Sequence, residues 1–186
     1  MKQAQKIIGR RMMLIAAEPE KHAAFILGLR LQERKSRYLS GQAPSVAEQI
    51  AWMQARDKLP NDAYFVIYEI AHPDTPLGTI RLHDVIPEQN SIRVSSWVMI
   101  DGVAPKKTLE ALALALEYAI DAGYPNCHYE VHKNTPTTLR FYTKLGTHIA
   151  GETAHTLILR VALPDFLRNM SAIYHMPAQH IQSIQF

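Results

Sequence analysis

A short basic turn between an expected strand and a long apolar helix holds the residues best suited to bind an anion. The turn reads Val103-Ala104-Pro105-Lys106-Lys107-Thr108. The first N–H groups of a helix have no acceptor inside the helix, so a strand that enters a helix here presents them to an anion. Pro105 is a favoured first helical residue, and the two lysines add positive charge. The sequence predicts an anion site; two solvated surface lysines are the alternative.

A second segment ends in an aromatic, hydroxyl-bearing stretch. It starts near Asn134-Thr135-Pro136 and closes with Phe141-Tyr142-Thr143-Lys144-Leu145-Gly146, in which the glycine is a helix stop. Together the two segments resemble the acetyl-CoA-binding core of the GNAT superfamily of N-acetyltransferases. The resemblance is strong over residues 96–146 and looser over most of residues 8–162.

The resemblance implies a role for each segment. Residues Val103 to Thr108 would hold the CoA pyrophosphate, although the glycines and the leading Gln or Arg of the family's usual Q/R-x-x-G-x-G/A turn are missing. Thr135 occupies the usual place of an Asn that meets the pantetheine, and Asn134 comes one residue early. Thr135 is expected to cap the following helix. Tyr142 matches the tyrosine near the CoA sulfur, where a phenol protonates the leaving thiolate; a half-buried packing aromatic is the alternative.

The expected central strand ends in Trp97-Val98-Met99-Ile100. Trp97 resembles a Trp of several GNAT subgroups that modify sugar-linked amines or protein N-termini, and a core tryptophan is the alternative. The backbone groups of Val98, Met99 and Ile100 would pair with the pantetheine amides in the way that an added strand does.

Acetyl transfer to an amine needs a base, or a water route, that removes a proton from the ammonium. His83 is the candidate base because it shares an alternation face with Arg81 and Thr79. A strand histidine satisfied by a neighbour or by solvent is the alternative, and Glu69 and Glu130 are weaker candidates. His128 and His132 do not predict a zinc site, since the strand offers no further ligands. We therefore expect no bound metal.

A basic cluster follows the first expected helix, in the segment that forms the acceptor wall in GNAT folds. A phosphate-bearing acceptor, such as a nucleotide-linked amino sugar, would suit it; a solvated helix end is the alternative. The cluster is Arg30, Arg34, Lys35 and Arg37.

The hydrophobic periodicity changes along the chain between that of helices and that of strands. It predicts one strand, two helices, three antiparallel strands, a helix, a strand, a helix and two strands. Their ranges are about 7–15, 18–31, 45–56, 64–68, 78–85, 91–99, 106–122, 127–132, 136–145 and 147–162, with a hairpin turn at 72–76. This order predicts an α/β (α+β) GNAT fold: a mixed, mostly antiparallel sheet of six to seven strands. A helix crossing between 91–99 and 127–132 makes those strands parallel, and the resemblance implies that they splay at the CoA site.

Composition narrows the class of protein. With 186 residues, 47% hydrophobic and 20% charged, the chain suits one globular core. A net charge of +3 argues for no nucleic-acid function. The single cysteine, Cys127, excludes an intrachain disulfide, and no apolar run reaches the ~20 residues of a membrane span. We expect a cytoplasmic protein.

We expect a GNAT domain at 1–163 and an extension at 164–186 that forms a homodimer contact, an extra helix or a loose end. The predicted function is transfer of an acetyl group from acetyl-CoA, the co-substrate, to the primary amine of a small molecule, with an amino sugar as the expected acceptor. One alternative is acetylation of a protein N-terminus, as in ribosomal-protein acetyltransferases. The other is a GNAT-fold module without catalysis that serves in binding or dimerisation, which the missing glycines favour.

Overall fold

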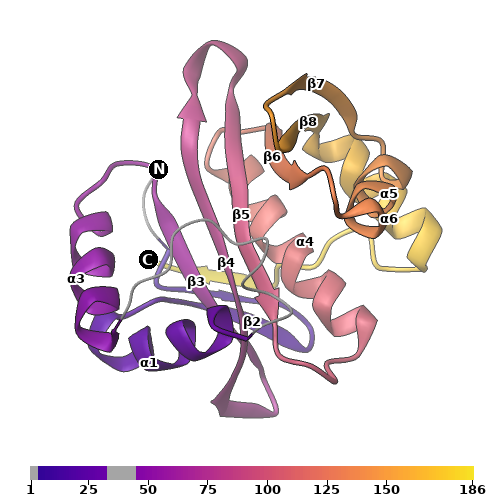
Figure 1. The fold of residues 1–186 in the computed structure, drawn as a ribbon. Helices are drawn as coiled ribbons and strands as arrows, with labels where there is room; N and C mark the ends of the chain where they lie inside the picture. Colours follow the sequence, from indigo (N-terminus) through magenta and orange to yellow (C-terminus); the bar gives the residue numbers. More distant parts are fainter. Residues whose placement is uncertain (1–3, 33–44) are drawn as a thin grey trace.

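The computed structural model describes residues 4–32 and 45–186. Nine strands form one open sheet in the order β7-β8-β6-β5-β4-β3-β2-β1-β9 (Figure 1). The strands are β1 (Lys6–Ile8), β2 (Met12–Ala16), β3 (Ala63–Glu69), β4 (His72–Ile86), β5 (Ser91–Met99), β6 (Asn126–His132), β7 (His148–Glu152), β8 (Thr156–Ala162) and β9 (Ser183–Gln185). The described helices are α1 (Pro19–Arg30), α3 (Val46–Arg56), α4 (Pro105–Asp121), α5 (Pro136–Lys144) and α6 (Leu163–Tyr174), with a 3-10 turn at Pro87–Gln89.

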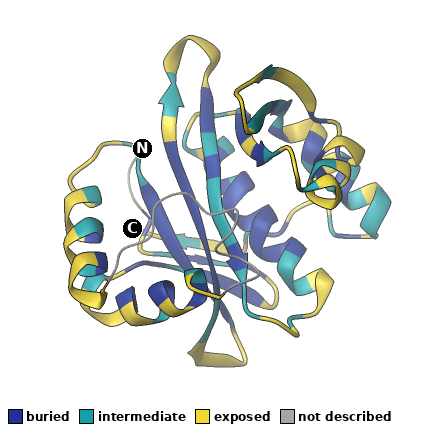
Figure 2. Cartoon of the chain, viewed as in Figure 1, coloured by how far each residue is buried: buried dark blue, intermediate teal, exposed yellow. Residues whose placement is uncertain are grey.

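Strand alternation divides the interior into two hydrophobic clusters. Leu14 and Phe65 belong to the larger cluster with α4, α5 and α6, whereas their neighbours Met13 and Tyr64 belong to a smaller one with α1 and α3. Successive strand side chains point to opposite faces of a sheet. Figure 1 shows α4 crossing behind the central strands, and Figure 2 colours β3 and the middle of β4, in front of it, as buried. The predicted mixed, mostly antiparallel α/β fold is confirmed.

Local signals set the ends of the helices. Ser45 caps α3 by accepting a hydrogen bond from the Glu48 N–H at 3.2 Å, as the sequence predicts for a capping box. Gly123, with φ of +93°, follows the end of α4. Ten residues of α4 are buried, because its apolar stripe is wide enough to cover the back of the sheet.

The single strand predicted at 7–15 is wrong. The segment is a hairpin of β1 and β2, and the Glu110 carboxylate of α4 accepts hydrogen bonds from the backbone of Arg10, Arg11 and Met12 at its turn. A side chain about 100 residues away satisfies these N–H groups, so the segment itself carries no signal for the turn. The turn predicted at 72–76 is also wrong, because these residues belong to β4.

The predicted number of six to seven strands is wrong as well. The β1–β2 division adds one strand, and β9, in the tail, pairs antiparallel with β1 to add another. Glu117 of α4 holds the approach to β9 by accepting hydrogen bonds from the His180 and Ile181 N–H groups at 2.9 and 2.8 Å. Of the three uses open for residues 164–186, the extra helix is observed as α6. A domain boundary at 163 stays a prediction.

The parallel pair β5 and β6 opens toward one end of the sheet. Only three pairs join them, from Ser91↔Asn126 to Arg93↔His128, although β5 continues to Met99 and β6 to His132. The splay that the resemblance implied is therefore present. Beyond these three pairs, a gap separates β5 from β6.

Candidate active site

A bulge in β5 marks the point of divergence. Ser95 pairs with Arg81 and Val98 pairs with Thr79, so β5 has one residue more than β4 between these pairs. Ser96 has a left-handed φ of +49°, and its carbonyl accepts a hydrogen bond from the Thr79 hydroxyl at 2.7 Å. A bulge bends its strand. The bend directs the end of β5 away from β6.

The divergence opens into a cleft of about 1070 Å³ in the described part of the chain. Side chains from α1, α3, β3, β4, β5, β6, α5 and β8 line it. A volume of this size matches the larger small-molecule sites of proteins. Four predicted site residues lie in its wall: His83, Trp97, Thr135 and Tyr142.

The residues predicted to hold CoA besides Trp97, Thr135 and Tyr142 are not in the lining of this cleft, whereas Arg30 and Glu130 are. Val98, Met99 and Ile100 continue β5 beyond it, and Ile100 donates its N–H to the Leu77 carbonyl on the β4 side at 2.8 Å. Because backbone groups alternate in direction along a strand, Met99 directs its own toward the opposite edge. Asn134 is exposed in the loop before α5. Val103 to Thr108 lie at the start of α4.

Tyr142 lies in α5 under the splayed strands and is 7% exposed. Its ring centroid is 4.3 Å from that of Tyr129 on β6. Burial, with a smaller contribution from Cys127, raises the pKa of Tyr142 well above its usual value. The phenol therefore stays protonated at neutral pH and has a proton to give.

His83 is buried in β4, and its Nε2 lies 2.7 Å from Ser95 Oγ. Its Nδ1 lies 3.0 Å from Asp84 Oδ2, an ion-pair distance without hydrogen-bond alignment. Burial and then Arg81 lower the pKa of His83 below 6.5, against the smaller raising effect of Asp84. A neutral imidazole at pH 7 has a nitrogen free to accept a proton.

The two carboxylates considered as weaker bases are both engaged. Glu69 Oε1 lies 2.5 Å from Lys107 Nζ, and this hydrogen bond lowers the pKa of Glu69. Glu130 lines the cleft and forms a hydrogen-bonded ion pair with Arg93. His83 therefore remains the better-placed base.

The anion site at the start of α4 stays a prediction. No side chain caps the helix at Ala104, Pro105 has no N–H, and the Lys107 N–H donates to the Ala104 carbonyl at 3.0 Å. The Lys106 N–H is therefore the first-turn donor that could meet an anion. The ion pair with Glu69 engages Lys107, whereas Lys106 is exposed. The predicted cap at Thr135 of α5 is wrong, because its hydroxyl donates to the His132 carbonyl at 2.6 Å instead of accepting from the helix.

Buried polar atoms without a hydrogen-bond partner gather at the cleft. The described residues contain seven such side-chain atoms. Four belong to residues of the cleft wall: His83 Nδ1, Arg93 Nε, Trp97 Nε1 and Tyr129 Oη. Native proteins pair nearly all buried polar groups, so this concentration indicates a place where a ligand or water completes the bonding.

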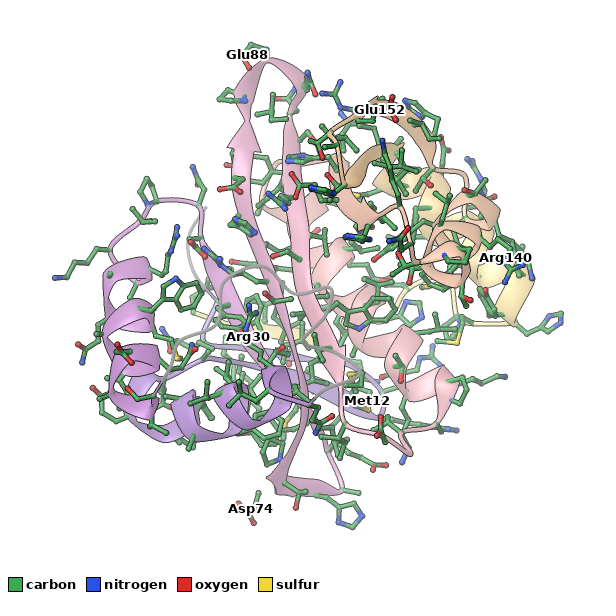
Figure 3. The ribbon with its side chains drawn as sticks, viewed as in Figure 1. Met12, Arg30, Asp74, Glu88, Arg140 and Glu152 are labelled. Carbon is green, nitrogen blue, oxygen red and sulfur yellow. The ribbon has the colours of Figure 1, made fainter. Side chains whose placement is uncertain are left out.

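The cleft wall near α1 and α3 is rich in guanidinium groups. Arg30 projects across the front of the central strands (Figure 3) and donates to Ser96 Oγ at 3.4 Å. Arg56 and Arg81 lie 5.4 and 5.1 Å from the centre of the Trp52 ring. Asp62 holds Arg81 through two hydrogen bonds. Of the predicted basic cluster, Arg34, Lys35 and Arg37 lie outside the described residues.

Sequence reasoning missed Ser95, Tyr129 and Trp52. Ser95 and Tyr129 lie in strands whose hydrophobic pattern indicates burial alone. Trp52 fits the apolar face of its helix and so indicates packing. The only signal for Ser95 was its place two residues before Trp97 at the end of the central strand. Their importance depends on the splay, which no local pattern encodes.

In 4–32 and 45–186, no three His, Cys, Asp or Glu side chains gather in a way that would hold a metal ion. His128 instead bonds Ser91, and His132 stacks on His155. No helix within these ranges is long and apolar enough to span a membrane.

Several solved acetyltransferase structures share this arrangement of strands and helices. FdhC, a nucleotide-linked sugar GNAT, superposes with a TM-score of 0.76 at 21% identity over 91% of this chain and 96% of that chain. A probable GNAT-family acetyltransferase from Chromobacterium violaceum gives 0.72 at 16% over 88% and 93%. The chain has the GNAT fold.

A third GNAT structure was determined with ligands. Spermidine N-acetyltransferase from Vibrio cholerae, in complex with CoA and spermine, gives a TM-score of 0.70 at 16% identity over 84% of this chain and 98% of that chain. No family sequence model and no curated protein sequence matches the chain. The likeness to the GNAT structures is therefore one of fold.

Proposed function

We propose that this GNAT-fold protein transfers an acetyl group from acetyl-CoA to a primary amine. The observation that carries the proposal is the splay of β5 from β6 after three residue pairs, with Tyr142 and His83 in the wall of the resulting cleft. The gap gives an extended pantetheine chain two strand edges to pair with. The V. cholerae structure of the same fold binds CoA.

The residues of the chain suit the steps of a direct transfer. The start of α4 and Lys106 would bind the CoA pyrophosphate, and the Met99 backbone, which faces away from β4, would orient the pantetheine with Trp97 beside it. His83 would take the proton of the acceptor ammonium, after which the free amine attacks the thioester carbonyl. Tyr142, kept protonated by burial, would protonate the CoA thiolate as it leaves.

We propose a sugar amine attached to a phosphate-bearing group as the acceptor. Arg30 and Arg56 line the α1–α3 end of the cleft, and guanidinium groups bind phosphate by charge-assisted hydrogen bonds. A cationic polyamine would meet like charge there. FdhC, which has this fold, is a nucleotide-linked sugar GNAT.

Thermal unfolding with and without acetyl-CoA tests the first step. A ligand at 100 times its dissociation constant stabilises a protein by about 2.7 kcal/mol, which raises the melting temperature measurably. No shift at millimolar acetyl-CoA would favour the binding-module alternative.

Release of CoA thiol with a panel of amines tests the acceptor. UDP-glucosamine should be acetylated with a higher kcat/KM than free glucosamine, and both should exceed spermidine. A peptide with a free N-terminus represents the ribosomal-protein alternative. Preference for that peptide or for spermidine would contradict the proposed acceptor.

A further inference from the structure

Two hydroxyl–imidazole pairs lie on neighbouring strands, but only one faces the cleft. Ser95 Oγ lies 2.7 Å from His83 Nε2, and Ser95 and His83 both line the cleft. Ser91 Oγ lies 3.0 Å from His128 Nδ1, and both of these side chains are buried outside the cleft wall. The Ser95–His83 pair is thus a candidate for chemistry in the cleft, and the buried Ser91–His128 pair is an internal control for it.

The cleft-facing pair continues into a third group. The other nitrogen of His83 lies 3.0 Å from Asp84 Oδ2. Serine, imidazole and carboxylate then follow each other in the order of a catalytic triad, in which the carboxylate orients the ring and stabilises its protonated form. The loose alignment at Asp84 is common in ligand-free sites.

His83 also joins two hollows. Besides the main cleft, it lines a smaller hollow of about 320 Å³ together with Asp84 and Arg56. The Asp84 side chain is 56% exposed, so that side of the ring has access to water. Asp84 itself has a left-handed φ of +49°, in the irregular pairing between His83 and Ile86. A backbone bulge thus turns the carboxylate toward the imidazole beside it.

We propose that Ser95, His83 and Asp84 form a proton relay that carries the acceptor's proton from the cleft to solvent. The relay rests on the proposed acetyl transfer. The acceptor ammonium gives a proton to Ser95 Oγ while the Ser95 hydroxyl proton passes to His83 Nε2. The amine is left with a free electron pair for attack on the thioester carbon, and the surplus proton on His83 leaves to water beside Asp84. Ser95 is then the catalytic residue that touches the acceptor, and Asp84 is a positioning residue.

The surroundings of His83 favour release of a proton from the imidazolium over its retention. Arg81 disfavours the imidazolium, whereas Asp84 and Asp62 favour it, and burial outweighs them. Arg93, the cross-strand neighbour, is held by Asp84 and Glu130. The charged and titratable described groups around the ring are Arg81, Asp84, Asp62, Arg93, Glu130, His128 and Arg56.

Replacement of the two serines tests the relay. Ser95→Ala should lower kcat/KM for UDP-glucosamine at saturating acetyl-CoA by roughly 10²-fold or more, as loss of a positioned proton transfer does. Ser91→Ala, the matched control, should stay within about threefold of the wild type. Acetyl-CoA should stabilise both variants as it does the wild type, which shows that they are folded. A Ser95→Ala variant with wild-type kcat/KM would overturn the relay.

The pH profile separates a relay from simple packing. The acid limb of kcat/KM should disappear in His83→Asn. In Asp84→Asn it should move to lower pH, because the carboxylate that raises the pKa of His83 is gone. An unmoved limb in Asp84→Asn would remove Asp84 from the relay. A stable acetyl group on Ser95 after mixing with acetyl-CoA alone would replace the relay by a covalent serine step.

An NMR titration of the His83 ring needs no acceptor substrate. It therefore tests the relay separately from the proposed acetyl transfer. The ring should titrate below 6.5 in the wild type and lower still in Asp84→Asn; equal values would contradict the relay. If acetyl-CoA fails to stabilise the protein while this coupling is present, the acetyl transfer is wrong and the coupled site remains.

Discussion

The buried polar groups behind the sheet and those around the cleft differ in how completely they are hydrogen-bonded. Behind the sheet, Glu110 accepts three backbone hydrogen bonds at the β1–β2 turn, and Glu117 accepts those of the segment before β9. Around the cleft, four buried atoms have no hydrogen-bond partner among the described residues. Three further atoms of this kind lie outside the cleft wall: Thr147 Oγ1, Arg160 Nε and His180 Nε2.

The difference separates two uses of buried polarity. A carboxylate that satisfies several N–H groups joins distant parts of the chain, and its removal leaves those groups unpaired. A buried polar atom without a hydrogen-bond partner at the edge of a cleft lowers the stability of the free protein. A ligand that bonds this atom restores that stability. The back of the sheet therefore stabilises the fold, whereas the cleft keeps bonding capacity for its ligands.

Replacement of Glu110 gives the largest expected effect and tests the first half of this comparison. Glu110→Ala removes the acceptor of three backbone N–H groups, of which that of Met12 is buried and those of Arg10 and Arg11 are part-buried. A buried unpaired group costs about 1–3 kcal/mol, and a part-buried one costs less because water reaches it. The free energy of unfolding should fall by about 2–5 kcal/mol, a loss of roughly 5 °C or more in melting temperature. Glu88→Ala, at the exposed tip of the β4–β5 hairpin in Figure 3, is the control and should change stability by less than about 0.5 kcal/mol. Equal stability of the two variants would contradict the role of Glu110.

Loss of the Tyr142 hydroxyl tests the cleft side. Tyr142→Phe keeps the ring that packs on Tyr129 but removes the proton for the leaving thiolate, so kcat should fall by roughly 10²–10⁴-fold. Acetyl-CoA affinity should change little. Tyr174→Phe, at a tyrosine outside the cleft wall, is the control and should retain kcat within about threefold in the acetyl-transfer assay. A Tyr142→Phe variant with wild-type kcat would make Tyr142 a packing residue.

Removal of the two lysines at the start of α4 should have a moderate effect. Lys106→Ala with Lys107→Ala should weaken CoA binding about tenfold, but should weaken binding of a pantetheine analogue without the pyrophosphate much less. Lys58→Ala, an exposed lysine in the segment after α3, controls for net charge. Calorimetric titration measures all three proteins. Equal weakening of both ligands would exclude the lysines from pyrophosphate binding.

The smallest expected effect is a loss of stability on acidification. Burial lowers the pKa of His22, His83 and His128 below their ordinary 6.5. Between the lowered values and 6.5, the unfolded chain binds more protons than the folded chain, so stability falls as pH falls through this window. Urea midpoints at pH 7.5 and pH 5.5 measure it. A midpoint that rises at pH 5.5 would contradict the lowered values.

The order of helices and strands was largely predictable, because it depends on local periodicity and caps. Ser45 with Glu48 predicted the start of α3, and Gly123 predicted the end of α4. The β1–β2 hairpin could not be predicted, since its turn depends on Glu110. The place of β9 depends on Glu117 and on a free edge at β1, and neither is visible in the tail itself.

For the site, the sequence by itself determined the residue types that chemistry needs: Tyr142 at a helix end, His83 in a strand, and a basic turn at 103–108. Only the tertiary structure decided which of them meet. β5 and β6 stop pairing after Arg93, close to the bulge at Ser96, and the cleft between them gathers His83, Tyr142 and Ser95. The packing of α4 separately brings Lys107 to Glu69. Local patterns report the burial and direction of a side chain, whereas a site depends on distances between elements that only packing sets.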